Sequence, residues 1–132
     1  MTVDLMMLVW SAILCGVLFL PYVLCRIGVW GLVDTVGYPT NPPALPAWAG
    51  RAYRAHLNMV ENLAPFMALV VVAHLAGAAN ATTALGATIF FWARLAHAIV
   101  YLSGVWRLRA PAFFIAVGGE LLILARLLPV LR

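Results

Sequence analysis

Long apolar runs separated by short breaks dominate this sequence. They predict four helices, at about residues 3–32, 51–77, 83–104 and 110–128. An α-helix needs roughly 20 apolar residues to cross the hydrocarbon core of a bilayer, and each run meets or approaches that length. The longest break, residues 34–50, is rich in proline and continues neither a helix nor a strand. The pattern therefore predicts an all-α integral membrane protein, with residues 1–132 forming one domain with four transmembrane helices.

The composition excludes an ordinary soluble domain. Hydrophobic residues make up 66% of the chain, charged residues only 9%, and the mean hydropathy is +1.05. We therefore expect membrane lipid, and not nucleic acid, around the protein. All eight basic residues are arginine, which is typical of a high-GC bacterial gene and indicates a bacterial inner membrane. Cys15 and Cys25 form no C-x-x-C motif, so we predict neither a disulfide nor a metal site there.

The arginines also predict the orientation of the chain in the membrane. Cytoplasmic loops carry an excess of positive residues over external ones. The second connection has no charge, whereas the first and third connections and their flanks hold Arg26, Arg51, Arg54, Arg107 and Arg109. We therefore predict that the first and third connections are cytoplasmic and that both termini lie outside.

Polar side chains gather on one face of each of the two middle helices. At 100° per residue, an arc of about 80° on the second helix holds Arg51, Arg54, Asn58 and Glu61. The third helix carries, at i, i+3 and i+7, Arg94, His97 and Tyr101. Ionisable groups at membrane depth are costly unless they face protein, water or a ligand. We expect Glu61 to neutralise one arginine, which leaves a net positive cleft.

Two interpretations of this cleft are open. Guanidinium groups bind carboxylates through paired hydrogen bonds, and a nearby arginine or tyrosine stabilises a thiolate, so the cleft suits a small acidic ligand. The same polar groups are equally suited to holding neighbouring helices together without any ligand.

The three histidines do not have the pattern of a metal site. No pair of them has the spacing of metal ligands. His56 lies off the polar face and is expected to be structural, and His74 is expected to stand alone in an apolar run. His97 lies on the polar face of the third helix, where a structural role and a ligand-binding role are both open.

Two motifs resemble those of a known family. The second helix reads Arg51-x-x-Arg54-Ala55-His56-x-Asn58-x-x-Glu61-Asn62-x-x-Pro65-Phe66. The third reads Ala93-Arg94-Leu95-Ala96-His97-x-x-x-Tyr101-Leu102 and is followed by Leu108-Arg109-Ala110-Pro111. In this order and spacing they resemble the MAPEG family, the membrane-associated proteins of eicosanoid and glutathione metabolism. The close resemblance covers roughly residues 48–112.

The resemblance implies a homotrimer of four-helix subunits that binds glutathione, a co-substrate, between neighbouring subunits near the cytoplasmic face. It also implies which side chains contact glutathione. On the second and third helices these are Arg51, Arg54, Asn58, Glu61, Arg94, His97 and Tyr101. Arg26 is similar in placement to a first-helix arginine that reaches glutathione in some members.

The resemblance is incomplete where catalytic residues are expected. Members that convert eicosanoids carry an Arg-Ser pair and then a tyrosine just after the Ala-Pro that opens the fourth helix. The corresponding positions here hold Phe113, Phe114 and Val117. Eicosanoid synthesis is therefore disfavoured. Another branch places its catalytic arginine just before the proline, so the resemblance implies that Arg107 or Arg109, with Tyr101, stabilises the thiolate.

Two functions follow. The first is a glutathione-dependent transferase or peroxidase whose lipophilic electrophiles or lipid hydroperoxides arrive from the bilayer. The second is a non-catalytic lipid-binding or scaffold protein of the same fold, which the apolar side chains of Phe113 and Phe114 favour. Binding of glutathione separates the two.

Overall fold

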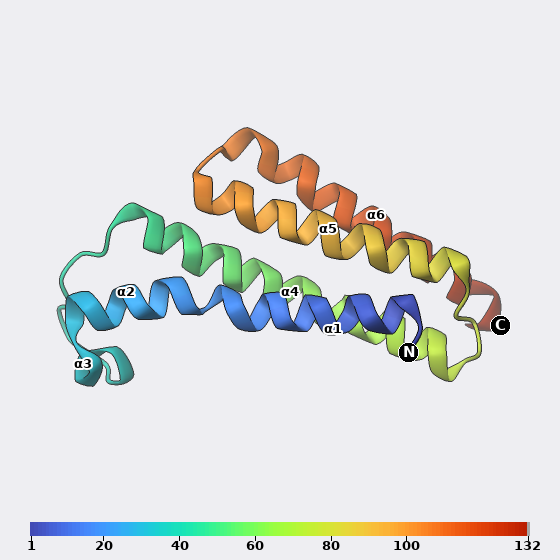
Figure 1. Cartoon of the computed structure of the whole chain (residues 1–132), viewed down its shortest axis with the longest axis horizontal. Helices are drawn as coiled ribbons and strands as arrows, with labels where there is room; N and C mark the ends of the chain where they lie inside the picture. The colour runs from blue at the N-terminus through green and yellow to red at the C-terminus, as the bar shows by residue number, and fades with distance from the viewer. Residues whose placement is uncertain (132) are drawn as a thin grey trace.

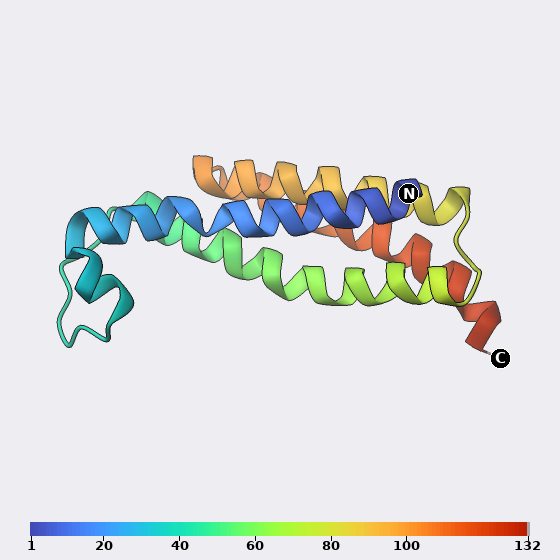
Figure 2. The ribbon, with the colours of Figure 1, turned by 60° about the horizontal axis from the view of Figure 1, so that its bottom comes forward.

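Long helices that lie side by side form the protein (Figures 1 and 2). The computed structural model describes residues 1–131. In chain order its elements are α1 (Val3–Leu18), α2 (Leu20–Trp30), α3 (Leu32–Val36), α4 (Ala47–Leu75), α5 (Ala81–Ser103), the 3₁₀ helix η1 (Trp106–Leu108), α6 (Arg109–Leu127) and the 3₁₀ helix η2 (Leu128–Leu131). Four stretches are long and apolar enough to cross a membrane, namely Val3–Trp30, Ala47–Leu75, Ala81–Ser103 and Trp106–Leu131. The all-α architecture with four candidate membrane spans agrees with the sequence pattern.

The bundle has two distinct ends. Both termini and the turn between α4 and α5 lie at one end, whereas α3 and the connection between α5 and α6 lie toward the other (Figures 1 and 2). Short connections force each span to return antiparallel to the one before it, so an even number of spans places the termini together. The arginine-rich connections are therefore opposite the termini. Which end faces the cytoplasm stays a prediction.

The first span is interrupted, whereas the sequence predicts one helix over residues 3–32. α1 ends at Leu18 and α2 begins at Leu20, with Pro21 in its first turn. Proline has no backbone N–H, and its ring clashes with the carbonyl four residues earlier, which accounts for the break at Phe19. Gly31 ends α2 with a φ of 82°, a conformation that favours glycine, and the chain turns there into the short α3.

The proline-rich break is shorter than the predicted residues 34–50, because helices extend into it from both sides. α3 runs to Val36, and α4 begins at Ala47 directly after Pro46. Alanine is the strongest helix former, and the first turns of α4 are rich in it. Pro65 remains inside α4 without ending the helix, which membrane helices tolerate when neighbouring groups satisfy the freed carbonyl.

The close packing of α5 against α6 depends on two glycines. An added Cβ at Gly86 would lie 2.5 Å from the carbonyl oxygen of Gly119, and one at Gly119 would lie 2.5 Å from the carbonyl oxygen of Gly86. Small residues at such crossings let the helix backbones approach closely. Helix α5 also contacts α4, where Phe90 stacks on Phe66 with ring centroids 3.8 Å apart. These contacts set the orientation of α5 relative to both neighbours.

His74 is not alone in apolar surroundings, contrary to the prediction. At the end of the bundle that holds the termini, its Nε2 lies 3.0 Å from a carboxylate oxygen of the buried Asp4. The same nitrogen lies 3.0 Å from Thr2 Oγ1, and Thr83 donates to the Asp4 carboxylate at 3.1 Å. This network joins the start of α1 to α4 and α5. The prediction was wrong because the partners of His74 are distant in sequence.

We expect Gly119→Ala to destabilise the protein by about 1–3 kcal/mol, because an added methyl group must push two helix backbones apart. Gly118 provides the matched control, since an added Cβ there meets no atom within 4 Å. Titration with SDS, followed by far-UV circular dichroism, measures the free energy of unfolding. It should fall for Gly119→Ala and not for Gly118→Ala. Equal values for the two variants would contradict this packing.

Candidate functional site

A small polar cavity lies at the end of the bundle that holds the α5–α6 connection. Its volume is about 170 Å³. Its walls come from the first turns of α4, the end of α5, η1 and the start of α6. It is lined by Arg51, Arg54, Tyr101, Gly104, Trp106 and Arg109. We call it the arginine cavity, and its three arginines and its tyrosine are all residues that the sequence singled out.

Local contacts position Arg51 at this cavity. Its Nε donates to the carbonyl oxygen of Leu102 at 3.2 Å, which ties α4 to the last turn of α5. Gly104 ends α5 with a φ of 81°, and an added Cβ there would lie 3.5 Å from the guanidinium carbon of Arg51. A glycine is therefore suited to this turn both for its backbone conformation and for the space that it leaves to the arginine.

Arg109 closes the arginine cavity from the α6 side. Its Nε donates to the carbonyl oxygen of Trp106 at 3.4 Å, and its guanidinium carbon lies 4.8 Å from the centroid of the Tyr101 ring. Within residues 1–131, none of the three arginines of the cavity forms an ion pair with a carboxylate. The cavity is therefore net positive, and a ligand with carboxylate groups would neutralise it through charge-assisted hydrogen bonds.

Deeper in the bundle, Arg94 is a buried cation whose hydrogen-bond partners are neutral. Only 1% of its surface is exposed. Its Nη2 donates to Asn58 Oδ1 at 2.8 Å, and its Nε lies 3.5 Å from the sulfur of Met59. In the described part of the chain, its Nη1 has no partner, and neither does a buried carboxylate oxygen of Glu120 on α6. The hydrogen bond to Asn58 is therefore a principal polar contact between α5 and α4.

His97 and Tyr101 extend the polar face of α5 from Arg94 to the arginine cavity. His97 is 4% exposed. Its ring centroid lies 5.4 Å from that of Tyr101, with the ring planes at 62°. Because Tyr101 also packs against the guanidinium group of Arg109, a row of polar side chains runs along α5 from the bundle interior to the cavity. The i, i+3, i+7 spacing predicts such a row.

Glu61 does not join the arginines. It is exposed on α4, and it forms no ion pair with an arginine in the part of the chain that the structure describes. The expected neutralisation of one arginine is therefore not made within the subunit. Arg54, two turns earlier on α4, is also exposed although it lines the cavity. One face of α4 thus carries charged side chains that its own subunit leaves uncovered.

Arg26 and Arg107 also lie apart from the arginine cavity. Arg26 packs among three aromatic rings beside a different cavity at the end of α2. Its expected contact with glutathione stays a prediction. Arg107 lies over the ring of its neighbour Trp106, 5.4 Å from the centroid, and does not line the arginine cavity. Of these two neighbouring arginines, Arg109, the first residue of α6, is the one that shares a cavity with α4.

Gly104 and Trp106 also line the cavity, although neither belongs to a polar face predicted from the sequence. A glycine directly after an apolar run is typical of a helix end, and that signal could have placed Gly104 at the end of α5. Tryptophan is common where membrane helices meet water, which could have placed Trp106 at the same depth. Neither signal shows that the two residues meet Arg51, because that contact depends on how the connection folds back.

The geometry of the two motifs can now be set beside known proteins. The MAPEG family model matches residues 7–128. The chain belongs to the MAPEG family. The four apolar spans and this membership identify an integral membrane protein.

This MAPEG protein is similar to microsomal glutathione S-transferase 1 of Bos taurus, with 40% identity over 79 residues, which are 59% of this chain and 51% of the relative. The proteins of the same name from Homo sapiens and Rattus norvegicus are each 38% identical over 79 residues, with the same coverage. The chain spans about half the length of the relatives it matches. No solved structure matches the chain at a significant level.

We expect Asn58→Ala to destabilise this MAPEG protein by about 1.5–3 kcal/mol, because it removes a hydrogen bond to a charged group that has no access to water. Asn62→Ala is the matched control. The Asn62 side chain donates to the carbonyl oxygen of Asn58 in its own helix at 2.7 Å, whereas the Arg94 hydrogen bonds in the described chain go to Asn58 and Met59. We expect it to cost about 0.5 kcal/mol or less. SDS titration of both variants measures the difference, and a larger loss for Asn62→Ala would contradict this role of Asn58.

Proposed function

We propose that the protein is a membrane-bound glutathione transferase or peroxidase that acts on lipophilic electrophiles or lipid hydroperoxides. The observation that carries this proposal is the cavity where three arginines of α4 and α6 meet without a carboxylate partner among the described residues. Glutathione has two carboxylates and a thiol, and it therefore offers the anions that such a cavity lacks. The names of the mammalian relatives, microsomal glutathione S-transferase 1, agree with this choice of co-substrate.

The residues of the cavity have separate roles in this proposal. Arg51 and Arg54 bind the carboxylates of glutathione through paired hydrogen bonds. Arg109 and the hydroxyl group of Tyr101 stabilise the thiolate, which is the reactive form of the thiol. Arg109, and not Arg107, has this role because only Arg109 lines the cavity with the α4 arginines. Asn58, Arg94 and His97 position the face of α5 that carries Tyr101.

In both proposed reactions, the thiolate of glutathione is the reacting group. In the transferase reaction, its sulfur forms a bond to an electrophilic carbon, and the leaving group departs with its electron pair. In the peroxidase reaction, two molecules of glutathione reduce a lipid hydroperoxide to the alcohol and water, and they are oxidised to a disulfide. The electrophile and the lipid hydroperoxide are lipophilic and reach the protein through the bilayer, whereas glutathione comes from the aqueous side.

The size of the cavity supports a site that neighbouring subunits share. Pockets for small molecules enclose roughly 300–1,000 Å³, and the arginine cavity encloses about 170 Å³. One subunit therefore encloses only part of a typical site. Arg54 and Glu61 are exposed on the same face of α4, and leaving a charge in lipid costs roughly 2.5–3.5 kcal/mol. We propose that a second copy of the chain covers this face in a homotrimer.

We also propose that the arginine cavity faces the cytoplasm of a bacterial cell. The positive-inside rule supports this orientation, because the arginine-rich connections lie at the cavity end of the bundle. Both termini are at the opposite end of the bundle (Figure 1), so in this orientation they lie outside. The arginine cavity would thus open toward the compartment that contains reduced glutathione.

We expect Arg54→Ala and Arg109→Ala each to lower kcat/KM for conjugation of glutathione by about ten- to a hundredfold, because each removes a charge-assisted hydrogen bond. The assay uses detergent-purified protein and a chloronitrobenzene as a generic electrophile. Arg126→Ala is the matched control, since Arg126 donates to Thr82 at the opposite end of the bundle and should leave the rate unchanged.

Three outcomes would count against the proposal. If glutathione does not bind in calorimetry, the non-catalytic lipid-binding or scaffold function replaces the enzymatic one. If Arg126→Ala lowers the rate as much as Arg54→Ala, the effect reflects the net charge of the protein and not the cavity. If Arg107→Ala lowers kcat/KM more than Arg109→Ala does, Arg109 is not the arginine that stabilises the thiolate.

The shared site predicts a defined oligomer. Native mass spectrometry of the protein released from mild detergent should show three copies of the chain, because the charged face of α4 needs a partner. The same experiment on Glu61→Lys should show a lower fraction of trimer, since that change replaces the negative charge on this face of α4 with a second positive charge. A monomer that binds glutathione with full affinity would contradict the shared site.

A further inference from the structure

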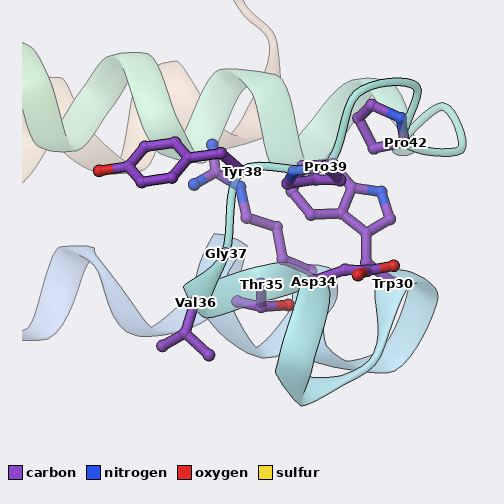
Figure 3. A pocket seen from close by; sticks show the side chains of 9 residues that line it. Trp30, Asp34, Thr35, Val36, Gly37, Tyr38, Pro39 and Pro42 are labelled. Carbon is purple, nitrogen blue, oxygen red and sulfur yellow. The ribbon is translucent and has the colours of Figure 1, made fainter.

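A second and larger cavity lies at the same end of the bundle, where α2 turns into α3. Its volume is about 510 Å³. Residues of α2, α3 and the proline-rich segment surround it, including Trp30, Asp34 and Tyr38 (Figure 3). It shares no lining residue with the arginine cavity. We call it the α2–α3 cavity.

Arg26 is the positive group of this cavity, and its charge is not neutralised. Its guanidinium carbon lies 5.0 Å from the ring centroid of Tyr22, 5.2 Å from that of Tyr53 and 5.4 Å from that of Trp30. Its Nε is buried without a hydrogen-bond partner, and Arg26 forms no ion pair within residues 1–131. The rings attract the cation and exclude water, but they supply no negative charge.

Asp34 is the negative group of the same cavity. It lies on α3, is exposed and lines the cavity together with Arg26. In the described structure the two side chains do not form an ion pair with each other. The α2–α3 cavity therefore contains one cation and one anion that are separated and unpaired. A ligand that matches this arrangement carries a negative and a positive group some distance apart.

The depth of the cavity in the membrane points to a phospholipid. The first span, Val3–Trp30, has 28 residues. A helix of that length extends about 42 Å, whereas the hydrocarbon core of a bilayer is about 30 Å thick. Arg26 and Trp30 belong to the last two turns of the span, so the cavity lies in the headgroup region. Aromatic side chains such as Trp30 and Tyr38 are common at this depth.

Hydrogen bonds hold the wall of the cavity in place before any ligand binds. Trp30 Nε1 donates to the carbonyl oxygen of Pro43 at 2.8 Å, which fixes the proline-rich segment against the end of α2. Thr35 Oγ1 donates to the carbonyl oxygen of Gly31 at 2.7 Å and stabilises the turn between α2 and α3. A preformed wall reduces the entropy that binding would otherwise lose.

We propose that the α2–α3 cavity binds the headgroup of a zwitterionic phospholipid of the phosphatidylethanolamine type. The phosphate pairs with Arg26, and the ammonium group pairs with Asp34 beside the aromatic rings. An anionic lipid such as phosphatidylglycerol offers the phosphate but leaves Asp34 without a cation. The site therefore prefers the zwitterion. This binding is separate from the arginine cavity and does not depend on the reaction proposed for it.

The test measures lipid binding directly. Delipidated protein in detergent is titrated with short-chain phosphatidylethanolamine or phosphatidylglycerol, and native mass spectrometry counts the bound lipids. We expect the unmodified protein to retain phosphatidylethanolamine at one molecule per subunit. Arg26→Gln should weaken this binding by about ten- to a hundredfold, because it removes a charge-assisted contact to phosphate.

Asp34→Asn tests the second contact. It should lower the affinity for phosphatidylethanolamine without lowering that for phosphatidylglycerol, so that the preference between the two lipids disappears. Arg126→Gln is the matched control, because it removes one arginine at the opposite end of the bundle and should change neither affinity. Equal thermal midpoints for Arg26→Gln and the unmodified protein show that the variant is folded.

Several results would overturn the proposal. One is equal binding of both lipids that Arg26→Gln leaves unchanged. Another is competition by soluble glycerophosphoethanolamine at the same concentration as the lipid, which would assign the cavity to a soluble phosphate ester. A third is a loss of glutathione affinity in Arg26→Gln with lipid binding intact, which would place Arg26 in the glutathione site of a neighbouring subunit. Each of these differs from a failure of the proposed enzyme activity, which Arg54→Ala reports.

Discussion

The hydrogen bond from Arg94 to Asn58 is the interaction on which the polar architecture depends. A guanidinium group inside a lipid-embedded bundle is stable only when polar groups surround it, and Asn58 is the polar partner that α4 provides. This contact fixes the rotation of α4 relative to α5. Because the two helices are antiparallel, the residues that precede Asn58 and those that follow Arg94 run toward the same end of the bundle. Arg51, Arg54 and Tyr101 meet there for that reason.

The polar groups at the two ends of the bundle differ in whether they have partners within the subunit. At the end with the termini, Asp4, His74 and Thr83 satisfy one another within the subunit, and they join three helices. At the other end, the arginines of the cavity have no carboxylate partner in the part of the chain that the structure describes. The first network therefore stabilises the subunit without any ligand. The second cluster has unpaired positive charge, which makes it the better candidate for function.

Two cavities at one end differ in the ligand that each suits. The arginine cavity is small and net positive, and it favours an acidic molecule from the aqueous side. The α2–α3 cavity is larger, contains a cation and an anion, and lies at the end of the first candidate membrane span. The break after Trp30 separates them, because Gly31 turns the chain away from the bundle. Under the proposed function, one substrate comes from water and the other from lipid, and the two cavities fit that difference.

The four apolar spans, the polar faces of the middle helices and the two motifs of the MAPEG family could all be predicted from the sequence. Each of these depends on periodicity or on order along one helix, which side-chain spacing encodes directly. Which of these faces meet became clear from the folded chain. It distinguished Arg109 from Arg107, left Glu61 uncovered, moved Arg26 to a separate cavity and gave His74 a partner near the N-terminus. Contacts between helices depend on how the breaks and turns orient them. The spacing of side chains along one helix does not encode that orientation.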